Sequence, residues 1–289
     1  MLRKATRQKA KIRLGLSAVS GGGKTYSALL IAYGMTNDWG KIAIIDTENG
    51  SADLYAHLGD YNVIPMVKFS PEDYIAAIKE CEAAGIEVII VDSITHEWEW
   101  CLQEQERLGG RYQDWAKITP RHNAFVKAMI NSPAHLITTV RRKQDYDITK
   151  DSAGKIKVEK AGLKEVTRDG WEYELTVNLE LDVRHYATAG KDRTGMFMDK
   201  PAFIPTIETG RAIMEWCNSG AEAITPGLPF FPSKEQDKKK FMDVAKALAD
   251  GTIENTNGEV VNFTLETVLK KYNLTNDVKQ ALIDEAANM

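Results

Sequence analysis

One run of the chain, from Leu14 to Thr25, constrains the fold more than any other segment. Its sequence, LGLSAVSGGGKT, fits the pattern G-x-x-x-x-G-K-[ST], with Ala18 at the first position, which the looser [AG] form allows. Glycines tolerate positive φ, so residues 20–23 can turn their N–H groups toward one anion, and a helix beginning near Lys24 adds its positive end. The run therefore predicts a phosphate-binding loop.

The segments on either side of this loop suit the same interpretation. Residues 11–16 alternate in polarity like a strand, and residues 26–32 form a compact apolar helix start, so the loop joins a strand to a helix. In such a loop the lysine reaches the β- and γ-phosphates and the threonine hydroxyl binds Mg²⁺, so we expect ATP and Mg²⁺ as ligands. The residues expected to contact the nucleotide are Ala18, Val19, Ser20, Gly21, Gly22, Gly23, Lys24, Thr25 and Tyr26.

A second signal is an apolar strand that ends in an acid, Val88 to Asp92. In phosphate-loop ATPases such a strand presents its aspartate to the Mg²⁺ shell, so Asp92 joins Thr25 as an expected metal ligand. Several ATPase classes place a glutamate directly after this aspartate, whereas this chain has Ser93. The water-activating base must then come from elsewhere, and Glu48 is the candidate, with Glu97 as the alternative.

Composition narrows the class of protein. A chain of 289 residues with 43% hydrophobic and 27% charged residues is ordinary for a globular protein with one large α/β domain and a small appendage. The amino-terminal residues lack the apolar core of a signal peptide, and no stretch approaches a membrane span, so we expect a cytoplasmic location without membrane contact. The three cysteines are far apart and odd in number, which suggests free thiols.

The order of apolar segments predicts the fold class. Strands are expected over 41–45, 63–69, 87–91 and 135–140, and helices near 25–36, 72–84, 94–108 and 119–131. This alternation is typical of an α/β fold with a mainly parallel sheet covered by helices on both faces. Two further strands, 155–159 and 172–181, are expected to be antiparallel additions.

The end of the chain has a different pattern. Residues 224–232 contain three prolines and predict a linker, and helices are expected over 234–250 and 264–288. We therefore expect an ATPase core over 1–225, followed by a linker and a small helical carboxy-terminal module over 226–289.

Two further groups of residues resemble the RecA-type ATPase core. Asp46-x-Glu48 followed by Asp53-x-Tyr55, with Val91-Asp92-Ser93-Ile94, resembles a core in which the glutamate after the second strand is the catalytic base. Residues 191–195, KDRTG, are similar to the K-x-R-x-G pattern with which RecA-like ring helicases and relatives reach a neighbouring subunit's γ-phosphate. The resemblance implies a RecA-like P-loop NTPase core, a homo-oligomer, and catalytic roles in trans for Lys191 and Arg193.

A closer resemblance covers nearly the whole chain. The chain resembles bacteriophage-encoded RecA-like ATPases, which are associated with single-strand DNA annealing and recombination. The resemblance implies single-stranded DNA and other phage recombination or replication proteins as partners, in the cytoplasm of a bacterial host. It is based on the segments 11–13, 23–29, 112–115, 138–143, 168–174 and 191–195.

The resemblance also suggests where DNA is bound. In RecA-like proteins the strand after the aspartate strand carries a γ-phosphate sensor, and a DNA-contacting loop follows it. Residues 135–140 match that strand, so Thr139 or Arg141 is the expected sensor. The expected DNA contacts are Arg141, Arg142 and Lys143, with the basic segment continuing to Lys164 and the basic run 3–13 as a second contact.

The charge pattern neither requires nor excludes DNA binding at this surface. The net charge of −4 excludes a globally basic nucleic-acid binder, although local basic patches can still bind phosphates. Acidic residues within 145–165 also permit an ordinary exposed hairpin. Tyr146 and Trp115 are candidate stacking residues, although packing is the simpler role for Trp98, Trp100 and Trp115.

The spacing of histidines and cysteines along the sequence does not indicate a metal site. The five histidines show no metal-ligand spacing, and none pairs with a cysteine in a zinc-like pattern. The favoured function is a DNA-stimulated ATPase. The alternatives are a nucleotide-gated DNA-binding or assembly module with little turnover, and a small-molecule phosphotransferase, which would not need Lys191 or Arg193.

Overall fold

The chain forms two compact units. The computed structural model describes residues 7–150, 156–221, 228–254 and 259–289. The larger unit is Lys11–Trp216, and the other combines the residues up to Ala10 with Cys217–Met289. The expected boundary between residues 225 and 226 lies outside the described residues.

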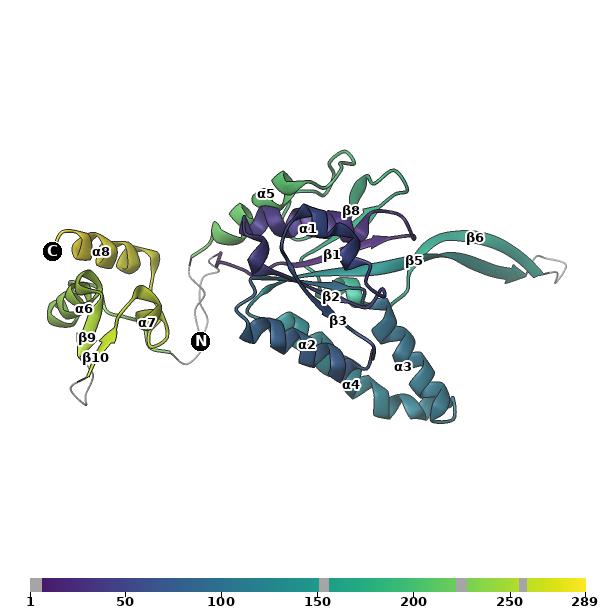
Figure 1. Cartoon of the computed structure of the whole chain (residues 1–289), viewed down its shortest axis with the longest axis horizontal. Helices are drawn as coiled ribbons and strands as arrows, with labels where there is room; N and C mark the ends of the chain where they lie inside the picture. Colours follow the sequence, from purple (N-terminus) through teal and green to yellow (C-terminus); the bar gives the residue numbers. More distant parts are fainter. Residues whose placement is uncertain (1–6, 151–155, 222–227, 255–258) are drawn as a thin grey trace. The chain divides into compact units, whose positions relative to one another are not determined.

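The larger unit is built on a mainly parallel sheet with the strand order β3-β2-β4-β5-β1-β7-β8 (Figure 1). Neighbouring strands on this path are parallel except β7 and β8, which confirms the predicted mainly parallel sheet. The strand expected as an antiparallel addition over 172–181 instead joins the sheet parallel to β1, and β8 is antiparallel to it. The strands are β1 (Arg13–Ala18), β2 (Ile42–Asp46), β3 (Asn62–Pro65), β4 (Val88–Asp92), β5 (His135–Lys150), β7 (Val177–Leu181) and β8 (Ala187–Asp192).

Strand register gathers polar residues at one edge of the sheet. Ala18 at the end of β1 lies opposite Arg141 in β5, and Asp46 at the end of β2 lies opposite Asp92 at the end of β4. Ligands of open α/β sheets bind outside the carboxyl ends of the strands. This edge is therefore where we expect the site.

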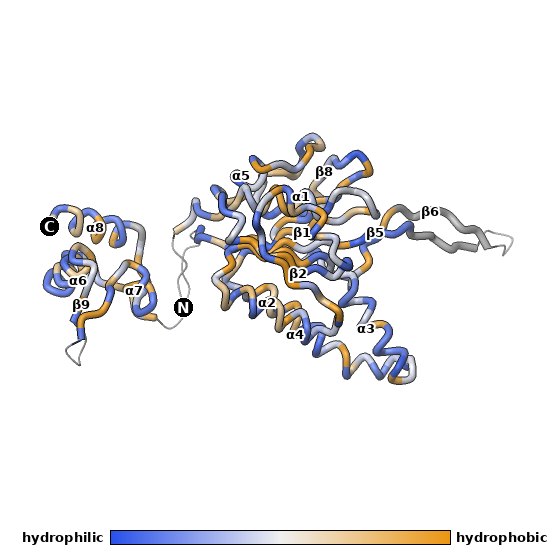
Figure 2. The backbone as a smooth tube through the Cα atoms, viewed as in Figure 1, coloured by the Kyte–Doolittle hydropathy of each residue, from blue (hydrophilic) through white to orange (hydrophobic). Residues whose placement is uncertain are grey.

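Helices cover both faces of the sheet, as predicted. Helices α1 (Lys24–Thr36) and α5 (Ile207–Asn218) lie on one face, and α2 (Pro71–Ala83) and α4 (Trp115–Asn131) on the other (Figure 1). A Cβ atom on Gly34 of α1 would lie 2.0 Å from the Ile207 carbonyl oxygen, so α1 and α5 approach closely only because glycine is present. The strands between these layers are largely apolar (Figure 2).

Three expected elements differ from the structure. The strand expected over 63–69 ends at Pro65, and Val67 is almost fully exposed. The helix expected to begin at 119 begins at Trp115 and contains Pro120. The strand expected over 172–181 starts only at Val177, because Gly170 at φ 93° leads into a 3-10 turn over Trp171–Glu174.

A two-stranded arm projects from the sheet. The strands expected over 135–140 and 155–159 belong to a longer hairpin, in which β5 continues to Lys150 and pairs with antiparallel β6 (Ile156–Glu165) (Figure 1). The pairing runs from Arg142 opposite Glu165 to Lys150 opposite Ile156. The segment expected to contact DNA is therefore a β-hairpin in its backbone.

The Arg13 side chain links β1 to the end of α4 through hydrogen bonds. Its buried guanidinium donates hydrogen bonds to the carbonyl oxygens of Ile130 (2.8 Å), Ser132 (2.6 Å) and Ala134 (2.8 Å). A cation at a helix carboxyl terminus satisfies carbonyls that have no partner within the helix. Arg13 is consequently not accessible to DNA, which corrects the expectation for this one residue of the run 3–13. Residues 3–6 of that run lie outside the described residues, and the role of the others stays a prediction.

The carboxy-terminal module has a core of its own, which includes Phe231, Phe241, Phe263 and Leu282. The single helix expected over 264–288 is two helices, and an antiparallel hairpin precedes them. No helix within the described residues is long and apolar enough to span a membrane. The elements of the module are α6 (Lys238–Asp250), β9 (Thr252–Glu254), β10 (Val260–Asn262), α7 (Leu265–Leu269) and α8 (Asn276–Ala287).

Candidate functional site

The glycine-rich loop between β1 and α1 closes on left-handed backbone conformations. Gly21 has φ 78° and Gly23 has φ 80°, so both need glycine. Ala18 is fully buried, and a Cβ atom on Gly22 would lie 2.6 Å from its methyl carbon. Alanine at the first position of the pattern therefore fits because residue 22 has no side chain.

Asp92, at the end of β4, is held by two hydroxyl groups. Thr25 Oγ1 donates to Asp92 Oδ2 at 2.5 Å, and Thr139 Oγ1 donates to Oδ1 at 2.5 Å. Burial raises the pKa of Asp92, and the two hydrogen bonds oppose that shift without cancelling it. The Thr25 hydroxyl and the Asp92 carboxylate are in contact and offer two oxygen ligands of the kind that Mg²⁺ prefers.

Lys24 lies over the same loop. Its ammonium group donates to the carbonyl oxygens of Val19 (3.2 Å) and Ala18 (3.4 Å). Burial lowers the pKa of Lys24, while the negative charges of Asp92 and Glu48 oppose this. The loop thus brings one cation next to two carboxylates.

Glu48 follows β2 and faces Arg141 of β5. The Asp46 carboxylate accepts hydrogen bonds from the backbone N–H groups of Glu48 (2.6 Å) and Ala52 (3.1 Å), which fixes the turn. The Arg141 guanidinium binds both carboxylate oxygens of Glu48, with Nε 2.9 Å from Oε1 and Nη2 in contact with Oε2. Burial alone would raise the pKa of Glu48, but Arg141 outweighs it and holds that pKa below its ordinary value.

These residues line one cavity of about 870 Å³. The lining also includes Tyr55, which belongs to the motif that resembles RecA-type ATPases. His185 and the segment 204–206 line the cavity too, and the sequence analysis did not single these out. The rings of Tyr26 and Tyr55 lie 5.8 Å apart between centroids. A polar floor beside an aromatic and apolar wall suits a nucleotide. The predicted residues that line the cavity are Ser20, Gly21, Gly23, Lys24, Thr25, Tyr26, Glu48, Asp92 and Arg141.

Comparison with protein families agrees with this geometry. A family model described as AAA domain matches residues 10–204, which is more than half of the chain. The chain belongs to the AAA domain family. Membership indicates a P-loop ATPase that binds nucleotide, and such ATPases typically use Mg²⁺. Comparison with curated proteins gives no match.

Several predicted residues of the AAA domain lie outside the cavity wall. Ala18, Val19 and Gly22 shape the loop from behind, and Thr139 is buried beneath Asp92. Glu97, the alternative base, is buried against other side chains and does not line the cavity.

Lys191 and Arg193 lie at the end of the AAA domain's edge strand, β8, away from the cavity. Lys191 Nζ donates to the carbonyl oxygens of Glu172 (2.6 Å) and Tyr173 (2.6 Å), and Arg193 Nη2 donates to that of Tyr173 (2.8 Å). The AAA domain therefore separates these two cations from the nucleotide cavity of the same chain.

The three residues expected to bind DNA do not share one surface of the AAA domain. Arg141 lines the cavity, and Arg142 donates to Glu180 (2.7 Å) and to the Leu163 carbonyl oxygen (2.8 Å). The Lys143 side chain is 68% exposed, with its nitrogen 3.9 Å from a Glu99 oxygen. Their role with DNA stays a prediction.

The aromatic residues considered for stacking on DNA differ in what the structure says of them. The side chain of Tyr146 lies outside the described residues. Trp115 stacks on Trp98, with ring centroids 5.5 Å apart, in agreement with a packing role.

No local sequence pattern marks the cavity positions that the sequence analysis missed. His185 sits at φ 69° in the turn between β7 and β8, and a Cβ atom on Gly23 would lie 2.8 Å from its ring nitrogen Nδ1. Its place beside the loop depends on β7 pairing with β1, which residue spacing along the chain does not reveal.

Proposed function

We propose that the chain is an ATPase of the RecA-like type that assembles as a homo-oligomer and acts on single-stranded DNA. We place it in phage recombination, annealing or replication, in the cytoplasm of a bacterial host and with other phage proteins as partners. The observation that carries the proposal is the cavity in which Lys24, Thr25, Asp92 and Glu48 meet. Membership of the AAA domain family supports the ATPase part.

The nucleotide site follows from these contacts. Lys24, which binds two loop carbonyls, is within side-chain reach of phosphates seated on residues 20–23. Thr25 and Asp92 would hold Mg²⁺, which neutralises phosphate charge during hydrolysis. A divalent cation would also offset the cost of a buried carboxylate at Asp92.

Glu48 is the proposed water-activating base, and its contact with Arg141 sets a condition. A carboxylate that is paired with a guanidinium is a weak base, because its proton affinity is lowered. A γ-phosphate in the cavity would give Arg141 a second anion to bind and so free Glu48. This observation favours, as a second candidate function, a nucleotide-gated DNA-binding module with slow turnover.

Lys191 and Arg193 are proposed to act in trans. Lys191 lies on β8, the edge strand of the sheet, and Arg193 directly follows that strand, where another subunit can approach. A cation supplied in trans can contribute about 10³-fold or more to hydrolysis. The separation of these two residues from the cavity of their own chain supports this role.

The test is a mixing experiment. Lys24→Ala should abolish nucleotide binding in a calorimetric titration, and Arg193→Ala should bind nucleotide but lose about 10³-fold in turnover. Mixed protomers should regain hydrolysis, because each supplies what the other lacks. Absence of rescue in confirmed mixed assemblies would show that each site is complete within one chain.

DNA binding needs its own measurement. Fluorescence anisotropy with a labelled single strand, with and without a non-hydrolysable ATP analogue, should show binding that weakens steeply with salt. The variant Arg142→Ala, Lys143→Ala should bind less tightly, and Arg141 is left unchanged because it lines the nucleotide cavity. Equal binding would move the DNA surface elsewhere, and no binding at low salt would favour the phosphotransferase.

A further inference from the structure

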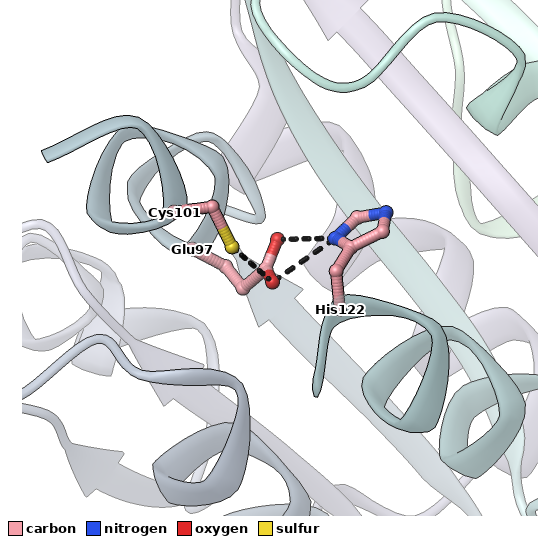
Figure 3. A group of neighbouring side chains, drawn as sticks. All are labelled: Glu97, Cys101 and His122. Carbon is pink, nitrogen blue, oxygen red and sulfur yellow. Dashed lines mark hydrogen bonds and ion pairs between the residues drawn. The ribbon is translucent and has the colours of Figure 1, made fainter. Parts of the chain in front are cut away.

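Three buried side chains join helix α3 (Thr95–Arg107) to α4 (Figure 3). Glu97 and Cys101 lie on successive turns of α3, and His122 faces them from α4. Their exposed fractions are 1%, 0% and 6%. His122 Nδ1 lies 3.0 Å from each Glu97 oxygen, and Cys101 Sγ lies 3.2 Å from Glu97 Oε1.

Fully buried aliphatic or aromatic side chains do not account for the position of α3, although half-buried Trp98 stacks on Trp115 of α4. The residues that α3 buries are Thr95, Glu97 and Cys101, with no aliphatic or aromatic side chain among them. Its neighbours differ, since α2 buries Tyr74 and Ile78, and α4 buries Phe125 and Met129. The fully buried contacts of α3 with α4 therefore include Glu97 and Cys101, whose side chains are typical metal ligands.

The geometry of the cluster suits a zinc ion. Thiolate, imidazole and carboxylate all bind Zn²⁺ at about 2.0–2.3 Å, which places ligand atoms about 3–4 Å apart. The three donor groups here lie within 4.8 Å of one another. A carboxylate that binds through both oxygens would complete four donor atoms together with the ring nitrogen and the sulfur.

Aromatic rings cover the cluster, as expected around a buried metal. The Trp98 ring of α3 meets the His122 ring edge-on at 5.6 Å, and the ring of Phe125, which is also on α4, lies 6.5 Å from that of His122. This cover limits access of water and strengthens electrostatic attraction between an ion and its ligands.

We propose that Glu97, Cys101 and His122 bind one Zn²⁺ ion that joins α3 to α4, at a site separate from the Mg²⁺ ligands Thr25 and Asp92. The two anionic ligands balance the charge of the ion. Without metal, the Cys101 thiol donates to Glu97 Oε1 at 3.2 Å. Binding therefore displaces the thiol proton to solvent, and zinc affinity falls as pH falls.

The competing account is an ordinary hydrogen-bonded cluster, with a histidine and a glutamate in contact and no metal. The two accounts differ in stoichiometry, in proton release and in the spectrum of a bound probe ion, so they can be separated on the full chain.

The first test measures metal content and a probe spectrum. Protein dialysed with Mg²⁺ and ADP, which occupy the nucleotide site, should retain one Zn²⁺ per chain by mass spectrometry of the metal. Replacement by Co²⁺ should give a thiolate-to-cobalt charge-transfer band. Cys101→Ser should lose both signals, whereas Cys81→Ser, at another buried free cysteine, should keep both.

A second test does not depend on whether the Cys101→Ser variant folds. The chain has three cysteines, so Cys81→Ser, Cys217→Ser leaves Cys101 as its only thiol. A Co²⁺ charge-transfer band in this variant, with release of a proton per metal in a weakly buffered titration, supports the site. Wild-type protein with less than about one tenth of a zinc per chain after zinc loading, or no band in the single-thiol variant, overturns the proposal.

Discussion

Two buried carboxylates, Asp92 and Glu97, lie close together in the sequence but have different surroundings. Each is 1% exposed. Asp92 ends a strand, accepts hydrogen bonds from two hydroxyl groups and lines the cavity, whereas Glu97 lies on a helix and contacts a ring nitrogen and a thiol. Hydroxyl partners leave a carboxylate able to exchange ligands at an open site. Glu97 is enclosed between α3 and α4, so its contacts help to hold these two helices together.

The largest effect that separates the two regions is expected from His122→Ala. The change leaves Glu97 buried without its ring partner, which costs about 3–5 kcal/mol in the free energy of unfolding. Urea denaturation measures this, and nucleotide affinity of the folded protein should stay unchanged. His57→Ala, at an exposed histidine, is the control and should change stability by less than about 0.5 kcal/mol. Equal stability of both variants would mean that the cluster does not hold α3.

Next in size is the effect on turnover of Glu48→Gln. Loss of the base should lower turnover about 10²-fold or more, with nucleotide binding retained. Glu97→Gln should leave the turnover of folded protein near the wild-type value, because Glu97 does not line the cavity. Steady-state hydrolysis and calorimetry measure the two quantities. The opposite result would assign the base to Glu97 and remove the contrast between the regions.

A smaller effect is expected from Asp92→Asn in the absence of Mg²⁺ and nucleotide. Because the folded-state pKa of Asp92 is raised, the folded protein is most stable with this group protonated, and that stability is lost as pH rises through the folded pKa. Removing the charge should raise Tm at neutral pH by about 2–4 °C, roughly 1 kcal/mol for a unit of this size. The gain should shrink as pH falls toward the ordinary aspartate range. If Asp92→Asn were less stable than wild type at pH 7, the prediction of a raised Tm would be wrong.

The smallest effect is expected from Lys143→Ala, outside both regions. Its side chain is mostly exposed and its ion pair with Glu99 is long, so Tm should change by no more than about 1–2 °C. If Lys143 contacts a DNA phosphate, the salt dependence of binding should weaken by about one unit of slope. Anisotropy titrations at several salt concentrations measure this, and an unchanged slope would remove Lys143 from the DNA surface.

The same contrast explains what the sequence could predict. The loop is visible because its residues are neighbours along the chain. Asp92 is visible because it ends an apolar run, although β5 separates β4 from β1 in the sheet. The resemblance to RecA-like proteins, and not residue spacing, made Arg141 one of the two expected sensors. It enters the cavity because β5 pairs with β1, and this register places Arg141 opposite Ala18. Strand order of that kind has no signature in residue spacing.

The cluster of Glu97, Cys101 and His122 was missed for a related reason. A search by spacing finds metal ligands that share a turn or a helix, but Cys101 and His122 meet only because α3 packs against α4. The arm was also predicted in pieces, because charged residues interrupt the apolar pattern of β5 beyond Val140.

Arg141 lies where β5 leaves the sheet and becomes the arm, and this position gives the arm the geometry of a lever. From Arg142 to Lys150 the strand pairs with β6. Nine residues at about 3.3 Å each make a length of about 30 Å. Rotation of the strand by about 5° at Arg141 would displace the far end by about 2–3 Å, a motion amplified by length alone. A rotation at the ion pair would thus displace Lys150 several times farther than it displaces Arg142.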